Sequence, residues 1–448
     1  MASITQETYE EKCRSKSISQ FSKDFKLEKL LERANIRKAK GVGVLSVFLG
    51  LLSVSFTGKP LSRLLQSRGW EGKKDVFYRF MNSTTSNWYR FICVLSAVVV
   101  AALQKLAPSG QIPVLILDDT IHKRDRSKKV ELLTRVRDHN DGRYYRGFRC
   151  LTLGFHNGNA FVPVAFRLLS SQKEETRING AQPDLDKRTN GYKLRLLAVS
   201  NAFQMAFHML ERQCTSARHV LFDSWFAKPV MFRTLRQMDL HGVGMLKADK
   251  GSFYRFKGKF YSLEALYAQV SHLIPREHGF VSVGVELRNG MPLSITFVRD
   301  KHSKRDWLAI GTSDMSLSSQ QVISLYSRRW NIEVFFKTVK SCLGFAKECQ
   351  SRSFDAVVCS VAVVFTRYIM LAWQNQGLPA PETSGQLFFR LCDEVQAISF
   401  DEALNIVIRE LKEHLVHLDG LLLLAVSDFF RRLPACFNPL HALLSCET

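Results

Sequence analysis

Short apolar runs between residues 112 and 312 constrain the fold of this 448-residue chain more than any other feature. Three of them follow one another closely, at Val114–Leu117, Leu151–Phe155 and Phe161–Phe166, and the later ones are separated by helical stretches. Short runs rich in Val, Ile, Leu and Phe are typical of buried strands. Consecutive strands followed by strands that alternate with helices predict a mixed α/β sheet.

Helical segments are predicted on both sides of this region, at residues 26–40 and 87–106 before it and from Ser319 to the end after it. A break at Pro108-Ser109-Gly110 makes a plausible boundary. Between the strands, the pattern predicts one helix at Tyr192–Glu211 and another at Lys228–Met238. Residues 250–312 alternate in the manner of strands, which predicts an inserted β-rich unit.

The charge balance indicates a polyanionic partner. The chain has 63 Lys and Arg residues against 41 Asp and Glu residues, which gives a net charge of +22. An excess of this size attracts phosphates and releases their counterions. Nucleic acid is therefore the favoured partner, and an anionic membrane surface is the alternative.

The apolar run Val42–Phe56 tests whether the chain spans a membrane. It is short for a span and is diluted by Gly and Ser, so we expect a buried core helix. The ten Cys residues include no CxxC pair, which argues against structural zinc and against a disulfide framework. Reduced thiols and a cytoplasmic location are the simplest interpretation.

Carboxylates stand at the ends of two predicted strands. Asp118 and Asp119 follow Val114–Leu117, and Asp223 follows another apolar run. Such a carboxylate is poorly placed for packing but well placed to enter a crevice at the edge of the sheet. Taken alone, each Asp would more simply form a turn or cap a helix.

A further carboxylate lies on an amphipathic helix predicted from about Ser318 to Leu343. Polar residues on this helix fall within an arc of roughly 80° at about 100° per residue. A solvated face with (i, i+4) ion pairs is the simpler interpretation. Together with the strand-end Asp residues, the face fits a site for two Mg²⁺ ions, because phosphodiester chemistry uses oxygen ligands for such ions. The polar residues are Tyr326, Arg329, Glu333, Lys337 and Lys340.

The spacing Tyr326-x2-Arg329-x3-Glu333-x6-Lys340 resembles the Y-R-E-K signature of bacterial insertion-sequence DDE transposases, which cut and paste DNA through hairpin ends. Asp118-Asp119-Thr120 resembles the first Asp motif of that family, D-x-T. Leu221-Phe-Asp-Ser-Trp resembles the second. The resemblance covers roughly residues 110–375.

This resemblance implies an RNase H-like fold with Asp118 on the first strand, Asp223 on the fourth and Glu333 on the helix after the insertion. The expected regions are a helical N-terminal region that binds DNA ends (1–108), the first part of the catalytic core (109–249), a β-rich insertion (250–316), the second part of the core (317–378) and a helical C-terminal region (379–448).

The resemblance also assigns roles to individual residues. Asp118, Asp223 and Glu333 would be catalytic and would hold two Mg²⁺ ions, for which Mn²⁺ would substitute. The D-x-T motif favours Asp118 as the first ligand, with Asp119 as the alternative.

Other residues would contact DNA. Trp307 would stack on a flipped base or, with equal weight, would pack the insertion onto the core. Residues that would contact phosphates near the cut are Tyr326, Arg329, Lys337 and Lys340. Residues 123–149 hold ten Lys and Arg residues against four acids, with aromatic residues between them, and this composition is typical of a phosphate-binding surface or of a solvated face.

The implied function is cut-and-paste transposition: cleavage of DNA strands, hairpin formation and strand transfer. The implied partners are terminal inverted repeats, target DNA and a second copy of the chain in a homodimer, without a membrane. The alternatives are an RNase H-fold nuclease without strand transfer and a transposase-derived DNA-binding protein without activity. A membrane-associated protein built on Val42–Phe56 is the remaining alternative.

Overall fold

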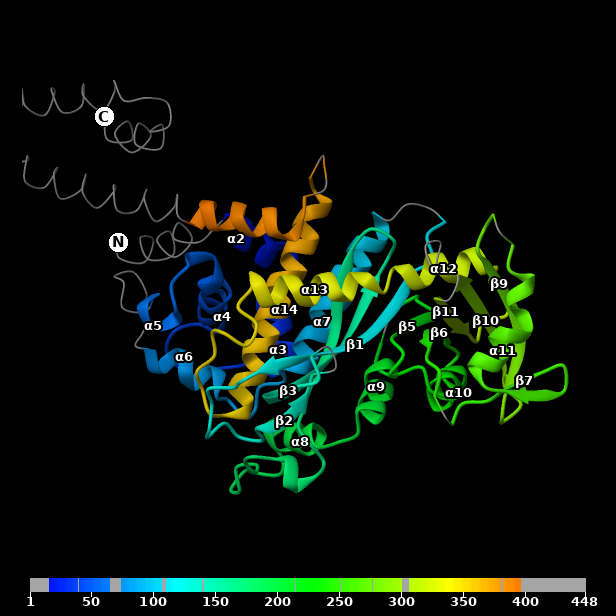
Figure 1. Ribbon diagram of the computed structural model, residues 1–448. Helices are drawn as coiled ribbons and strands as arrows, with labels where there is room; N and C mark the ends of the chain where they lie inside the picture. The colour runs from blue at the N-terminus through cyan, green and yellow to red at the C-terminus, as the bar shows by residue number, and fades with distance from the viewer. Residues whose placement is uncertain are drawn as a thin grey trace, which may run out of the picture.

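A single sheet organises the molecule. The computed structural model describes residues 16–395, except residues 39, 65–73, 107–109, 139–140, 214, 250, 276, 300–305, 379 and 381. Within these residues, eleven strands form one mixed sheet that runs across the molecule, with helices on its two faces (Figure 1). The predicted mixed α/β fold with an RNase H-like core is confirmed.

The first part of the sheet combines antiparallel and parallel pairs. Strand β3 (Tyr144–His156) lies between β1 (Val114–Lys123) and β4 (Phe161–Leu169) and is antiparallel to both. On the other side of β1, β5 (His219–Phe222) and then β6 (His241–Leu246) run parallel to it. Apart from the exposed beginning of β3, these strands are largely buried, which explains why their sequences contain continuous apolar runs.

The β-rich residues after β6 extend the same sheet. Strand β11 (Trp307–Thr312) pairs with β6, followed by β10 (Pro292–Arg299) and β9 (Phe280–Leu287), all antiparallel. The short hairpin of β7 (Tyr254–Phe256) and β8 (Lys259–Tyr261) completes this end. The β-rich unit therefore shares one continuous sheet with β1 and β5.

Apolar helices cover the other end of the sheet. The helices α7 (Trp88–Lys105) and α14 (Phe354–Gln376) pack against each other and against β4, and α4 (Val44–Ser53) packs on α14. By length and composition α7 and α14 could cross a membrane, but 89% of the apolar stretch of α14 is buried within the molecule. The run Val42–Phe56 supplies α4, whose central residues are buried as predicted.

Smaller helices fill the remaining surface. They are α2 (Lys16–Asp24), α3 (Leu27–Arg33), η1 (Val54–Thr57), α5 (Leu61–Leu64), α6 (Lys74–Met81), η2 (Glu174–Thr176), α8 (Asn190–Ala198), α9 (Ala202–Leu210), α10 (Pro229–Gln237), α11 (Leu263–Val270), η3 (Ser271–Leu273), α12 (Ser319–Ser327) and α13 (Trp330–Ser341). Of the predicted C-terminal region 379–448, the residues from 396 onward lie outside the described residues. Residues 108 and 109 of the predicted boundary also lie outside them.

Two local predictions were wrong. The single helix expected at Tyr192–Glu211 is broken into α8 and α9, because the Asn201 side chain caps α9 by accepting a hydrogen bond from the Phe203 backbone N–H at 2.8 Å. A short strand, β2 (Thr134–Arg137), was not predicted. Asp223 therefore follows the fifth strand in chain order and not the fourth.

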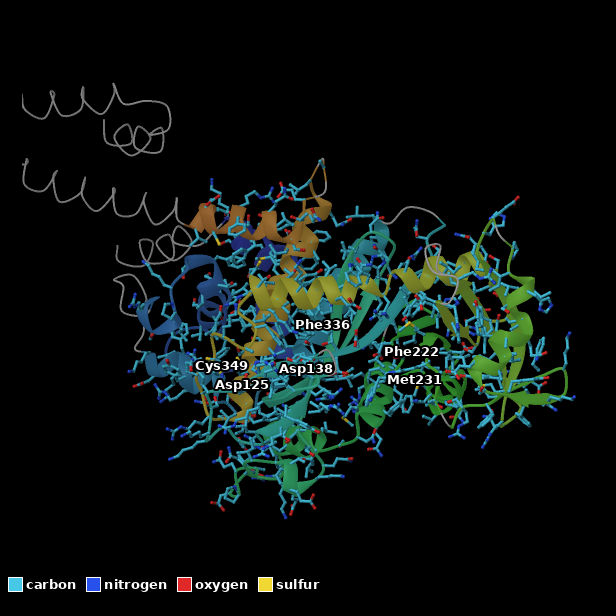
Figure 2. All side chains as sticks on the ribbon, viewed as in Figure 1. Asp125, Asp138, Phe222, Met231, Phe336 and Cys349 are labelled. Carbon is cyan, nitrogen blue, oxygen red and sulfur yellow. The ribbon has the colours of Figure 1, made fainter. Side chains whose placement is uncertain are left out.

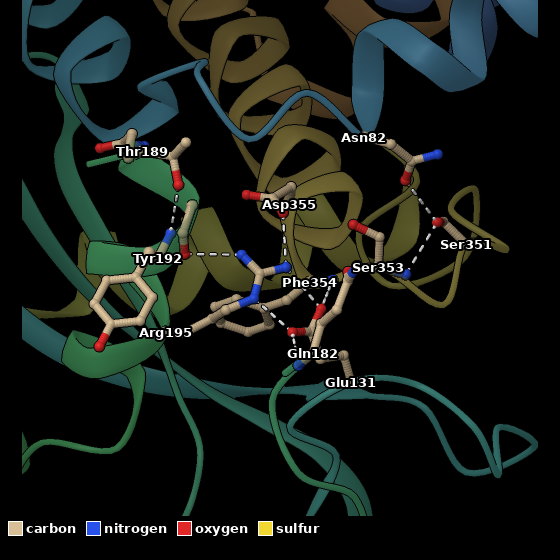
Figure 3. A network of polar contacts seen from close by, with 12 residues as sticks. Asn82, Glu131, Gln182, Thr189, Tyr192, Arg195, Ser351, Ser353, Phe354 and Asp355 are labelled. Carbon is tan, nitrogen blue, oxygen red and sulfur yellow. Dashed lines mark hydrogen bonds and ion pairs between the residues drawn. The ribbon is translucent and has the colours of Figure 1, made fainter. Parts of the chain in front are cut away.

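A buried ion-pair network joins three distant segments (Figure 3). The Arg195 guanidinium of α8 donates to the carboxylates of Glu131 and Asp355, with Nη2–Oδ2 of Asp355 at 2.7 Å. Glu131 also accepts hydrogen bonds from the backbone N–H groups of Gln182 and Phe354. All three charged side chains are less than 10% exposed, at 4%, 9% and 3%. The network ties the segment after β1 to α8 and to the start of α14.

Replacing Arg195 by Met should lower the free energy of unfolding by about 3–5 kcal/mol, because two carboxylates would remain buried without their cation. Urea unfolding followed by circular dichroism measures this change. Arg188→Met is the matched control, since the Arg188–Asp186 pair is exposed (91% and 47%) and exposed pairs contribute no more than about 1 kcal/mol. Equal stability of the two variants would contradict a stabilising role for the network.

Candidate active site

The register of β1 and β5 brings two of the predicted carboxylates together. Leu117 of β1 is aligned with Phe222 of β5 in a parallel pair. Asp118 and Asp223 are the next residues on these two strands, and adjacent strands lie about 4.8 Å apart. The two side chains therefore stand beside each other where β5 ends.

Asp118 and Asp119 face opposite sides of the sheet, as successive strand residues must. The Asp118 carboxylate accepts a hydrogen bond from Nη1 of Arg329 at 3.2 Å. The Asp119 carboxylate is paired with Arg149 on β3 at 3.0 Å. Of the two acids, Asp118 is therefore the one that faces the helix carrying Glu333.

Arg329 links Asp118 to Glu333. Its Nη1 is bound to Asp118, and its Nη2 donates to Oε1 of Glu333 one turn further along α13. The guanidinium is only 16% exposed, so these charges interact with little screening by water. Two of the three predicted carboxylates thus share one arginine, and the third, Asp223, stands beside Asp118.

The helix that carries Arg329 and Glu333 is not continuous, and the prediction of one helix over Ser318–Leu343 was wrong. The chain forms α12 and then α13, joined by Arg328 and Arg329. Backbone hydrogen bonds at the junction span three residues, for example from Arg329 N–H to the Tyr326 carbonyl oxygen at 2.9 Å. Such bonds tighten the turn and place Arg329 at the beginning of α13, above β1.

The electrostatics of the site favour a cation. Burial, followed by the neighbouring charges of Asp223 and Asp119, raises the pKa of Asp118 to about 8, against the lowering effect of Arg329. Burial also raises the pKa of Tyr326. The negative charges of Asp223 and Asp118 add to this shift, and Arg329 acts against it. Arg329 alone does not offset the negative charge gathered at this edge of the sheet.

The donor atoms suit a hard divalent cation, but the side chains are not arranged around one. Among the residues that the structure describes, no three His, Cys, Asp or Glu side chains are close enough together to hold a metal ion. Glu333 is held by Arg329. Oδ1 of Asp223 accepts hydrogen bonds from the backbone N–H groups of Trp225 and Phe226, at 3.1 and 3.3 Å. Asp223 thus forms the turn that a strand-end Asp commonly forms, and its second carboxylate oxygen remains for a ligand.

The remaining polar residues of the predicted face lie near these acids. The Tyr326 ring lies 5.8 Å from the Arg329 guanidinium carbon. Desolvation lowers the pKa of Lys340, whose charged neighbours include Asp138, Lys123 and Asp118. Lys337 is exposed on α13.

Trp307 lies at the same edge of the sheet as Asp223. Phe222, Gly244 and Gly311 are at one level across β5, β6 and β11. Trp307 comes four residues before Gly311 in the sequence. Because β11 is antiparallel to β6, Trp307 lies toward the end of the sheet at which Asp223 follows β5. Its ring is stacked on Tyr267, with centroids 4.3 Å apart and planes 14° apart, and it also contacts Phe297. One face of Trp307 is therefore already occupied within the β-rich unit.

Two side chains at the site were not predicted from the sequence. Arg149 pairs with Asp119 and lies over the Trp225 ring at 5.4 Å. Trp330, the residue after Arg329, is 63% exposed although it is large and apolar. The available signal for Trp330 in the sequence was its position directly after Arg328 and Arg329. No local signal distinguishes Arg149 from the other basic residues around it.

A mixed sheet with helices on both faces and acids at the ends of central strands is the arrangement of an RNase H-like core. Residues 37–258 match a family model described as DDE superfamily endonuclease, and residues 198–370 match one described as Transposase DDE domain. No curated protein matches the chain. Both matches are to families of the DDE type, and they support a nuclease-type enzyme that acts on DNA with a divalent metal.

The raised pKa of Asp118 makes a prediction for the metal-free protein. A carboxyl group titrates near 4 in an unfolded chain and at about 8 here, so the native state binds the proton more tightly. The stability that this group contributes is present at low pH and is lost as the pH rises to about 8. The thermal midpoint should therefore fall between about pH 5 and about pH 9 more steeply for wild type than for Asp118→Asn. Asp239→Asn is the control, because that side chain is 88% exposed. Parallel curves for wild type and Asp118→Asn would contradict the shift.

Proposed function

We propose that this protein is an insertion-sequence transposase that cuts DNA at the ends of its element, forms hairpins and joins the freed ends to target DNA. The observation that carries the proposal is that Asp118 and Glu333 both bind Arg329 while Asp223 stands beside Asp118, at positions covered by the two matches to DDE families. The spacing of Tyr326, Arg329, Glu333 and Lys340 supports the hairpin-forming class.

Asp118, Asp223 and Glu333 are the residues that would hold two Mg²⁺ ions, or Mn²⁺ in their place. Such ions would activate the attacking oxygen and support the leaving oxygen of a phosphodiester. Asp118 is preferred to Asp119, because Asp119 faces Arg149 on the other side of the sheet.

Arg329 has a second part in this proposal. While it is bound to Asp118 and Glu333, its guanidinium offsets part of their negative charge. A phosphate group, like a carboxylate, offers two oxygens that can accept parallel hydrogen bonds from a guanidinium. Transfer of Arg329 from the acids to a DNA phosphate would free Glu333 to turn toward Asp118 and Asp223. Tyr326, Lys337 and Lys340 would support the same backbone.

Each chemical step in this scheme is an in-line phosphoryl transfer. Water first cleaves one strand and leaves a 3′-hydroxyl, which attacks the opposite strand and forms the hairpin. A second water opens the hairpin, and the 3′-hydroxyl then attacks target DNA. No covalent protein intermediate is required. We also propose that a homodimer in the bacterial cytoplasm brings two ends together.

Glu333→Gln should reduce DNA cleavage by about a thousandfold, since several kcal/mol of charge stabilisation is lost while the size of the side chain is kept. Gel analysis of a labelled element end measures cutting, and a mobility shift measures binding, which should persist. Glu264→Gln on α11 is the matched control, because Glu264 is exposed and remote from α13 in the sequence. Undiminished cleavage by Glu333→Gln would refute the role of this carboxylate.

Trp307→Ala should slow hairpin formation or opening by about tenfold or more while nicking continues, since stacking on a base contributes about 1–3 kcal/mol. Time courses on labelled ends separate these steps. Tyr267→Ala distinguishes the two roles of Trp307, because Tyr267 is its stacking partner. If Trp307 only packs the β-rich unit, both variants will show the same defect at every step, nicking included.

An endonuclease that does not join strands is the second candidate, and the match to the DDE superfamily endonuclease model favours it. The same acids would serve both activities. Supplying pre-cut ends together with a plasmid target separates them. Joined products support the transposase, and hydrolysis without joining supports the nuclease.

A further inference from the structure

Arginines stand directly opposite each other on the hairpin formed by β2 and the beginning of β3. Arg135 is aligned with Arg146, and Arg137 is aligned with Tyr144. Like charges at directly opposite positions destabilise an antiparallel pair of strands. A row of guanidinium groups at this spacing therefore has an electrostatic cost that the hairpin itself does not relieve. We call Arg135, Arg137 and Arg146 the arginine ladder.

The ladder faces solvent. Along β2, Thr134 and Val136 are buried, whereas Arg135 and Arg137 are exposed. Arg146 is exposed as well, and Tyr144 is 67% exposed. Among the described residues, none of the three arginine side chains forms an ion pair, whereas Arg149 of the same strand β3 is paired with Asp119. The ladder is thus a concentrated positive surface.

The acids around the hairpin are engaged elsewhere. The Asp125 carboxylate accepts a hydrogen bond from the backbone N–H of Arg146 and not from its guanidinium. Asp138 is paired with Lys123 at 3.7 Å, and Asp141 accepts a hydrogen bond from the Tyr145 hydroxyl. Figure 2 places Asp125 and Asp138 below α13, on the side of β2 and β3. Within the part of the chain that the structure describes, no ion pair joins these acids to the ladder.

The sheet relates the ladder to the candidate active site. Asp118 is aligned with Thr152 of β3, and Arg146 lies six residues before Thr152 on the same strand. Because side chains two apart share a face, Arg146 and Tyr144 lie on the face that Asp118 and α13 occupy. At roughly 3.3 Å per residue the separation is about 20 Å. This distance corresponds to about six base-pair steps of roughly 3.4 Å each.

We propose that the arginine ladder binds the phosphate backbone of duplex DNA about half a helical turn from the phosphate that is cut. Guanidinium groups pair with phosphates through two parallel hydrogen bonds, and the bound phosphates remove the repulsion between Arg135 and Arg146. The position of the cut rests on the proposed function. The binding surface itself does not depend on catalysis.

The test compares the variant R135Q/R137Q/R146Q with the matched control R33Q/R233Q/R236Q. The control removes three exposed arginines from α3 and α10. The probe is a duplex of about forty base pairs of arbitrary sequence, and fluorescence anisotropy is recorded over a range of salt concentrations without divalent ions. Each lost phosphate contact lowers the slope of log K against log salt by about 0.9. The ladder variant should therefore lose up to about 2.7 from this slope, and the control should keep the wild-type slope.

Thermal unfolding without DNA supplies an independent measurement. The ladder variant should unfold at the same temperature as wild type or higher, because the repulsion between its strands has been removed. A reduced salt slope in a variant that remains folded supports the proposal, whether or not the wild type cuts DNA. A ladder variant that is folded and keeps the slope of the control overturns it, even if Glu333→Gln behaves as expected.

Discussion

The parallel pairing of β1 with β5 is the interaction on which the rest of the site depends. Burial of two apolar strands side by side sets Asp118 against Asp223. The hydrophobic effect that stabilises the strands is not directional and does not relieve the charge placed at their ends. Burial first, and then the neighbouring charge of Asp223, raise the pKa of Asp118 to about 8. A site of this kind gains stability from any cation that reaches it.

Arg329 supplies a cation from within the chain. The tightened junction between α12 and α13 directs its guanidinium toward β1, where it is bound to one acid from the sheet and one from its own helix. In this arrangement the Glu333 carboxylate is bound to Arg329. Exchange of a carboxylate for a phosphate at Arg329 would couple the binding of DNA to the assembly of the three acids. The proposed chemistry thus begins with a change of partner at one side chain.

The continuous sheet gives the surfaces around the site fixed positions. Trp307 and the arginine ladder lie at different points on strands that share hydrogen bonds, directly or through neighbours, with β1 and β5. The distance between two residues on a strand is well defined, because each residue advances along the strand by a nearly constant rise. The buried network of Arg195, Glu131 and Asp355 holds the segment after β1 against α14. A DNA duplex that touches the ladder and the candidate active site would therefore meet two surfaces at a defined spacing.

The sequence by itself determined the kind of sheet, most of its strands, the burial of the apolar helices and the residues of the candidate site, because these follow from local periodicity and from spacing along the chain. It did not determine the breaks at Asn201 and at Arg328, where a side-chain cap or a tightened turn overrides helical periodicity. Only the tertiary structure decided that Asp118 and not Asp119 faces α13, and that Arg135 stands against Arg146. Strand register sets both, and register depends on pairing between residues that are distant in the chain.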